Sequence, residues 1–194
     1  MRRQWTLRLI ACGAVGAAVL SGCSEKHAAN TTLPDASSFS ATVGELPPLG
    51  PADLQMPAAA RTADKTGAEA FIRYYFDLLN RSLVDLDPQY LRQFAANCED
   101  CERIALETES DARNGYHYKG GQLTIQGDMS VAITAPGRAE SAFIADQAAM
   151  TVVDSSDQPI PDLVLDRKPE LSSGTLATWD ADTSSWRINV LTLG

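Results

Sequence analysis

Two cysteines separated by three positions are the clearest candidate for chemistry in this chain, in the run Cys98-Glu99-Asp100-Cys101. A redox dithiol needs a depressed thiolate pKa, which the two intervening carboxylates oppose. A zinc site needs further ligands, and the whole chain has only two histidines. Positions i and i+3 at a helical turn bring two Cα atoms within the separation that a disulfide tolerates. We expect a structural disulfide, with redox catalysis and metal binding as the alternatives.

The amino end has the pattern of a secretory signal. Arg2, Arg3 and Arg8 make residues 1–8 basic, and the twelve residues Leu9–Leu20 carry no charge. A bilayer-spanning helix needs about 20 apolar residues, so this run is too short to span a membrane.

The signal ends in Leu20-Ser21-Gly22-Cys23, which resembles the lipobox of bacterial lipoproteins. The resemblance implies cleavage before Cys23 and attachment of diacylglycerol to its thiol. Two or more acyl chains anchor a protein stably, whereas one anchors it only marginally. We therefore expect a membrane anchor on Cys23 and a location on the extracytoplasmic face of the cell membrane, where disulfides persist. The alternative is an ordinary secretory signal that happens to contain a cysteine.

Net charge limits the classes of partner. Removal of residues 1–22 takes three arginines and no acid, so the formal charge of −9 becomes −12. An acidic chain is repelled by nucleic-acid backbones and by anionic lipid surfaces. The sequence therefore excludes nucleic acid as a partner.

The composition divides the chain into three parts. After the signal peptide (1–22), residues 23–63 are rich in Ser, Thr, Ala and Pro and have no sustained apolar period. Such a segment buries too little apolar surface to offset its ordering entropy, so we predict a disordered tether. Residues 64–194 have the length of one ordinary domain.

Helices are predicted at the start of that domain. One begins at Asp64 or Thr66, a second follows Asp87-Pro88, and a third starts near Cys101 and stops at Asn114-Gly115. The cysteine pair lies at the joint between the second and third helices. The first helix has one apolar face, formed by Phe71, Tyr74, Tyr75, Leu78, Leu79 and Ser82.

The period changes to two after Gly115. A strand is predicted over 123–134 with a bulge at Gly127, followed by a turn at Pro136-Gly137. Residues 139–153 return as a strand, although their first half is also compatible with a helix. A hairpin of 176–179 and 186–191 closes the chain, with Trp186, Ile188 and Val190 on one face. This order predicts an α+β domain in which the N-terminal helices pack on one side of a twisted antiparallel sheet.

These elements resemble the nuclear transport factor 2-like fold of ketosteroid isomerase and SnoaL, a cone-like α+β shape. The resemblance implies a pocket on the concave face of the sheet, near Tyr75, His117 and Asp128. Either His117 or Asp128 would then be a candidate general base, although both also fit exposed positions and Tyr75 fits the core. The lipobox, the tether, the helix around Phe71–Phe76 and the cysteine pair also resemble a family of actinobacterial lipoproteins of unknown function.

The sequence favours a non-enzymatic binding or interaction module. No phosphate loop, nucleophile elbow or metal-ligand cluster is present in the sequence, and no cofactor is expected. The expected partner is a small apolar ligand or another cell-envelope protein. The alternative is an isomerase or cyclase that works in the same cone-shaped pocket.

Overall fold

Helices precede strands along the folded part of the chain. The computed structural model describes residues 46–194, so the predicted signal, Cys23 and the tether residues 23–45 lie outside the described residues. The helices are a 3₁₀ turn η1 (Ala58–Arg61), α1 (Lys65–Asp85), α2 (Gln89–Gln93) and α3 (Glu99–Arg113). The strands are β1 (His117–Gly120), β2 (Leu123–Ala135), β3 (Arg138–Gln147), β4 (Met150–Val153), β5 (Pro159–Leu165), β6 (Lys168–Asp180) and β7 (Ser185–Leu193).

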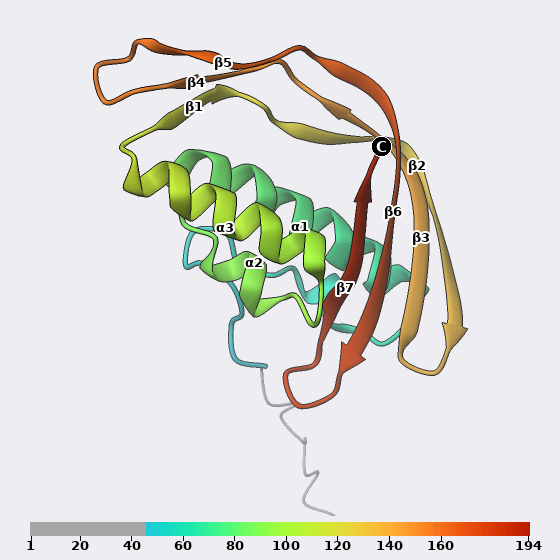
Figure 1. Cartoon of the computed structure of the whole chain (residues 1–194). Helices are drawn as coiled ribbons and strands as arrows, with labels where there is room; N and C mark the ends of the chain where they lie inside the picture. Colours follow the sequence, from blue (N-terminus) through green and yellow to red (C-terminus); the bar gives the residue numbers. More distant parts are fainter. Residues whose placement is uncertain (1–45) are drawn as a thin grey trace, which may run out of the picture. The chain divides into compact units, whose positions relative to one another are not determined.

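The strands form two antiparallel sheets. The larger has the order β2-β3-β6-β7, and the smaller has the order β1-β4-β5. Figure 1 shows α1 and α3 against the inner side of the larger sheet, while β1, β4 and β5 arch over these helices. The α+β class and the placement of the helices on one side of an antiparallel sheet are thus confirmed.

Helix α1 begins and ends with local signals that the sequence carries. The Asp64 carboxylate accepts a hydrogen bond from the Gly67 backbone N–H at 2.7 Å, and Leu86 ends the helix in the left-handed region. All six residues of the predicted apolar face are buried. The periodicity therefore identified both the helix and the side that faces the core.

The two shorter helices lie close to their predicted positions, although Pro88 rather than Asp87 is the N-cap residue of α2. The Asp87 carboxylate accepts a hydrogen bond from the Gln89 N–H, directly before α2. Helix α3 has Cys98 as its N-cap residue and ends at Arg113, before Asn114-Gly115. The cysteine pair lies between α2 and α3, as expected.

Two of the four register shifts in the larger sheet bear on the predictions, and the sequence predicted the first of these two. Gly127 has φ +59 where the β2–β3 register shifts between Gln126 and Ser130. The second bulge is in β7, where Leu176 pairs with Val190 but Ala177 pairs with Ile188. The extra residue, Asn189, reverses the alternation of faces. Trp186 and Ile188 are buried, but Val190 is 47% exposed, so the prediction that all three share one face is wrong.

The smaller sheet was largely missed by sequence reasoning. Residues 138–147 form strand β3 rather than a helix, and 150–153 form the separate strand β4 in the other sheet. Strand β5 contains Pro159, Pro161 and Asp162, which are unfavourable in strands. Because of these residues, the short apolar end of the strand is not recognised from the sequence pattern. The β4–β5 pairing is irregular opposite these residues.

Residues 46–63 belong to the folded unit, so the predicted tether is wrong for this segment. Met56 and Ala60 are buried, and the Thr62 carbonyl accepts a hydrogen bond from the Trp186 ring N–H at 2.9 Å. A Cβ on Gly67 of α1 would overlap that carbonyl oxygen, which shows how closely the segment packs. A periodicity rule does not detect this packing because the buried residues follow no regular period.

The core lies between the helices and the larger sheet. Phe71 and Phe94 make an edge-to-face contact with ring centroids 6.1 Å apart, and Trp179 and Trp186 make another at 5.5 Å. Trp186 is fully buried. The space between these helices and the larger sheet is therefore filled by the protein's own side chains.

Candidate functional site

The three residues predicted to share a pocket lie in different environments. Tyr75 is fully buried in α1 and donates a hydrogen bond to the Leu91 carbonyl, and burial raises the pKa of its hydroxyl. His117 is exposed on β1 in the smaller sheet, and Asp128 is exposed in the β2 bulge. None of the three lines the hollows beside the disulfide and α3 that are described next.

Cys98 and Cys101 are joined by a disulfide, as the sequence predicts, with their Cα atoms 5.2 Å apart. Both are buried, and the Cys98 sulfur accepts a hydrogen bond from the Cys101 backbone N–H. The bond therefore closes the first turn of α3 at its junction with the segment that follows α2. A buried disulfide in this position supplies no thiolate nucleophile.

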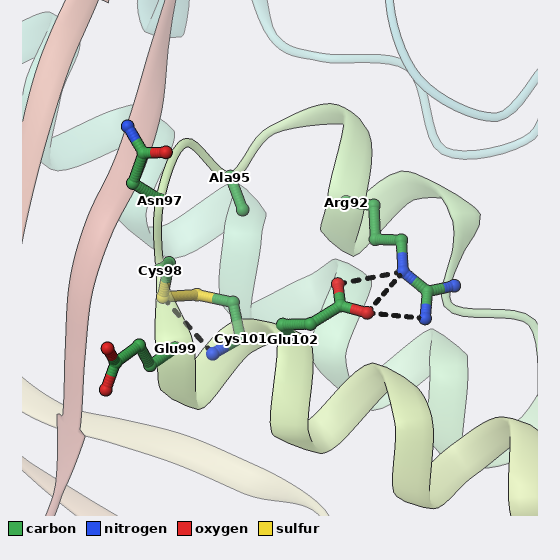
Figure 2. A pocket seen from close by; sticks show the side chains of 7 residues that line it. All are labelled: Arg92, Ala95, Asn97, Cys98, Glu99, Cys101 and Glu102. Carbon is green, nitrogen blue, oxygen red and sulfur yellow. Dashed lines mark hydrogen bonds and ion pairs between the residues drawn. A yellow bond between two sulfur atoms is a disulfide. The ribbon is translucent and has the colours of Figure 1, made fainter.

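An open hollow of about 500 Å³ lies beside this disulfide (Figure 2). Arg92 faces Glu102 across it, with nitrogen–oxygen distances of 2.9 Å, and also pairs with Glu109. These hydrogen bonds hold the pKa values of both glutamates below the ordinary value and raise the pKa of Arg92. Arg92 is thus fully engaged within the protein, and Glu99 is the remaining charged residue of the lining.

A second concavity lies between α3 and the smaller sheet, and we name it the α3 groove. It consists of two adjacent hollows of about 330 Å³ and about 370 Å³. The two hollows share four lining residues, namely Glu107, Tyr118, Met150 and Leu165. The groove thus continues from the helices outward along the β4–β5 arm that Figure 1 shows above α3.

The inner hollow is lined by side chains of α1, α3 and several strands, in which apolar residues mix with polar ones such as Arg103, Glu107 and Lys168. Its two buried hydroxyls are turned back onto their own helices. Ser82 donates to the Leu79 carbonyl at 2.7 Å, and Thr108 donates to the Ile104 carbonyl at 2.9 Å. The apolar lining consists of Leu79, Leu83, Ile104, Leu123, Met150, Leu165 and Leu193.

The outer hollow combines exposed apolar side chains with carboxylates. Leu163, Val164 and Leu165 of β5 are 39%, 60% and 37% exposed, and all three line it. At its base the Tyr118 hydroxyl donates to the Asp111 carboxylate at 2.6 Å. Burial, this hydrogen bond, and the negative charges of Asp111 and Glu107 together raise the pKa of Tyr118.

Several polar groups of the groove already have partners within the protein. The hydroxyls of Ser82 and Thr108 already have acceptors on the backbone, and the Glu107 carboxylate pairs with Arg103 at 3.2 Å. In the described part of the chain, no group of three or more His, Cys, Asp or Glu side chains is arranged to hold a metal ion. Within the same residues, no helix has the length and apolar character to cross a membrane.

Sequence reasoning missed the groove because it missed β5. The run Leu163-Val164-Leu165 was the available signal, but it follows Pro161 and Asp162 and is too short to show a period. The groove also requires α3 to lie opposite the smaller sheet, which is a tertiary relation.

No family model matches the chain, and no curated protein matches it significantly. Several solved structures are similar in fold at low identity. The intermembrane-space region of chloroplast protein ARC6 has a TM-score of 0.49 and 15% identity, over 68% of this chain and 97% of that one. Aln2 from a Streptomyces species has a TM-score of 0.41 and 10% identity, over 68% and 93%.

A domain of unknown function from Nostoc punctiforme has a TM-score of 0.39 and 10% identity, over 67% of this chain and 78% of that one. It is described as having a cystatin-like fold, which belongs to the nuclear transport factor 2-like superfamily. Scores and identities this low carry no information on activity.

Proposed function

We propose that this chain is a lipid-anchored extracytoplasmic protein whose domain, of nuclear transport factor 2-like type, is a non-enzymatic binding module with the α3 groove as its ligand site. The observation that carries the proposal is the row Leu163-Val164-Leu165, exposed along a concavity. Covering apolar surface contributes about 25 cal/mol per Å² removed from water. An apolar ligand or partner segment in the groove would gain this contribution.

The two buried hydroxyls of the inner hollow are compatible with binding of an apolar group there. Because Ser82 and Thr108 bond to backbone carbonyls, an apolar ligand leaves neither hydroxyl without an acceptor. The isomerase or cyclase alternative is based on His117 or Asp128 as its general base. His117 and Asp128, the two candidates, are exposed and line neither hollow, so we do not propose that alternative.

The anchor rests on the sequence. The basic segment, the apolar run Leu9–Leu20 and the lipobox-like Leu20-Ser21-Gly22-Cys23 together support export and acylation of Cys23. The disulfide between Cys98 and Cys101 is consistent with an oxidising compartment. The ligand is therefore expected outside the cytoplasm, as a small apolar molecule or as part of another envelope protein.

The binding site can be tested with a neutral apolar dye, N-phenyl-1-naphthylamine, whose fluorescence rises on transfer from water. The protein is the chain from residue 23 to Gly194 carrying Cys23→Ala, made without its signal segment and thus without lipid. We expect saturable binding that Val164→Ser with Leu165→Ser weakens about tenfold, since about 1.4 kcal/mol is lost. Matched substitutions of exposed aliphatic residues elsewhere, Ile133→Ser with Val190→Ser, should leave binding unchanged. Equal losses in both double variants would exclude the groove as the site.

The anchor has its own test in cells grown with a labelled fatty acid. We expect Cys23→Ala to abolish acyl labelling of the protein, because no other residue accepts diacylglycerol in the proposed scheme. Unchanged labelling of this variant would contradict the lipid anchor.

A further inference from the structure

The outer hollow of the α3 groove is lined by apolar and acidic side chains. Its charged lining residues are Glu107, Asp111 and Asp162, and none of its lining residues is Lys or Arg. Lys168 lines the adjacent inner hollow and has no ion pair in the described part of the chain, but two other basic side chains of this region have acidic partners. Arg103 pairs with Asp100 and Glu107 from the inner hollow, and Lys119 pairs with Asp157.

The geometry of β5 places one of these carboxylates beside the apolar row. The pairing of β4 with β5 shifts between Thr151–Val164 and Val153–Pro159, so extra residues of β5 lie opposite Val152. Asp162, within this bulge, has φ +66, a conformation that Asp tolerates better than most residues. A bulge of this kind redirects a side chain, here into the lining of the outer hollow next to Leu163.

The electrostatic field at the base of the hollow is negative. The Tyr118 hydroxyl is a neutral donor, so its hydrogen bond leaves the charge on Asp111 in place. The charges of Asp111 and Glu107 both act on Tyr118. A cationic group is therefore attracted to this hollow and an anionic one is repelled.

The edge position of β5 points to a polypeptide occupant. In the order β1-β4-β5, no described strand pairs with the outer edge of β5. Pro159 and Pro161 lack N–H groups, which leaves residues 162–165 as the part of the edge able to pair with another strand. An extended segment can bond to this backbone while its side chains cover the apolar row.

We propose that the outer hollow binds an extended polypeptide segment of another envelope protein that carries both aliphatic and basic side chains on the face it turns toward the hollow. This deepens the proposed function and rests on it. The aliphatic side chains cover Leu163, Val164 and Leu165, and the cationic side chains reach Asp111 and Asp162.

The test uses fluorescein-labelled short peptides and the lipid-free chain from residue 23 to Gly194 with Cys23→Ala. Anisotropy is measured for peptides whose inward positions, every second residue, carry leucine and lysine, leucine and glutamate, or serine and lysine, with threonine at the positions between. We expect only the leucine–lysine peptide to bind saturably. Asp111→Asn with Asp162→Asn should weaken it about tenfold, an effect that added salt reduces.

The matched control removes two carboxylates elsewhere, by Asp128→Asn with Asp182→Asn, and should leave affinity unchanged. Both residues are exposed, and each double variant reduces the negative charge of the chain by the same amount. Unchanged urea midpoints for both variants show that the folds are intact.

Four results would overturn the inference. Equal weakening in both double variants would mean general attraction to an acidic chain. Equal binding of the leucine–glutamate peptide would show that positive charge is not required. Equal binding of the serine–lysine peptide would show that apolar side chains are not required. Absence of binding by all three peptides would also reject the inference. Binding of the neutral dye in that case would show that the proposed apolar site still holds.

Discussion

The two sides of the helical layer in this protein have opposite characters. Toward the larger sheet, α1 and α2 meet a closed core in which Phe71, Tyr75 and Trp186 are fully buried. Toward the smaller sheet, α3 faces β5, whose residues Leu163 and Val164 remain exposed around an open groove. On both sides, helices pack against strands that carry aliphatic side chains.

The difference arises from how much of each sheet the helices cover. The long strands of the larger sheet present several rows of side chains to α1, and large aromatic rings fill the space between them. The smaller sheet has only short strands, and α3 presents Glu107 and Asp111 to it rather than apolar residues. Carboxylates keep that interface hydrated, because an unpaired charge is too unfavourable to bury. The closed side stabilises the fold, and the open side leaves apolar surface uncovered.

The largest expected effect is the loss of a core side chain on the closed side. Trp186→Ala removes a fully buried ring, its contact with Trp179 and its hydrogen bond to Thr62. We expect the free energy of unfolding to fall by about 3–5 kcal/mol, measured by urea denaturation. On the same strand, Val190→Ala should change it by less than about 0.5 kcal/mol. Similar losses in the two variants would contradict the placement of the β7 bulge.

Next in size is the disulfide that joins the two sides at the start of α3. In the chain-entropy model, so small a loop contributes about 2 kcal/mol. We expect Cys98→Ser with Cys101→Ser to lower the free energy of unfolding by this amount and to abolish the effect of added reductant.

The native bond should also resist glutathione in a thiol-trapping titration, because both sulfurs are buried. Ready equilibration with glutathione would favour the redox alternative over the structural one.

A smaller loss is expected where residues 46–63 attach to the closed side. The Arg61 guanidinium donates to the backbone carbonyls of Thr183, at 2.9 Å, and Ser184. Arg61→Ala should lower the free energy of unfolding by about 1–2 kcal/mol in urea. Lys65→Ala removes the same charge from an exposed site and should change it by less than about 0.5 kcal/mol. Equal stability of the two variants would count against docking of this segment.

The smallest effect concerns pH and the ion pairs of α3. The pKa values of Glu102 and Glu109 are held below 4.5 by Arg92, so the unfolded chain binds their protons at higher pH than the folded chain does. Their contribution to stability is therefore present above 4.5 and is lost as the pH falls through the depressed values. We expect Arg92→Gln to reduce the loss of stability between about pH 5 and pH 3, measured from urea midpoints. An unchanged pH profile would show that these pairs are too solvated to matter.

Local signals made much of the closed side predictable. The Asp64 cap, the periodicity of α1, the disulfide spacing and the Gly127 bulge depend on neighbours close in sequence. The sequence predicts Val190 on the wrong face because the bulge at Asn189 depends on how β7 pairs with β6. The sequence of β7 alone gives no visible sign of this bulge. The sequence predicts residues 46–63 as part of the tether because their buried residues follow no helical or strand period.

The sequence by itself determined the acidic charge, the lipobox-like signal, the cysteine pair and the order of helices before strands, because each is a local or compositional property. Only the tertiary structure decided that Tyr75 is buried while His117 and Asp128 are exposed, and that α3 faces the smaller sheet. The α3 groove joins residues from α3, β1, β4 and β5. Long-range packing brings these segments together, and no spacing within any one of them records that outcome.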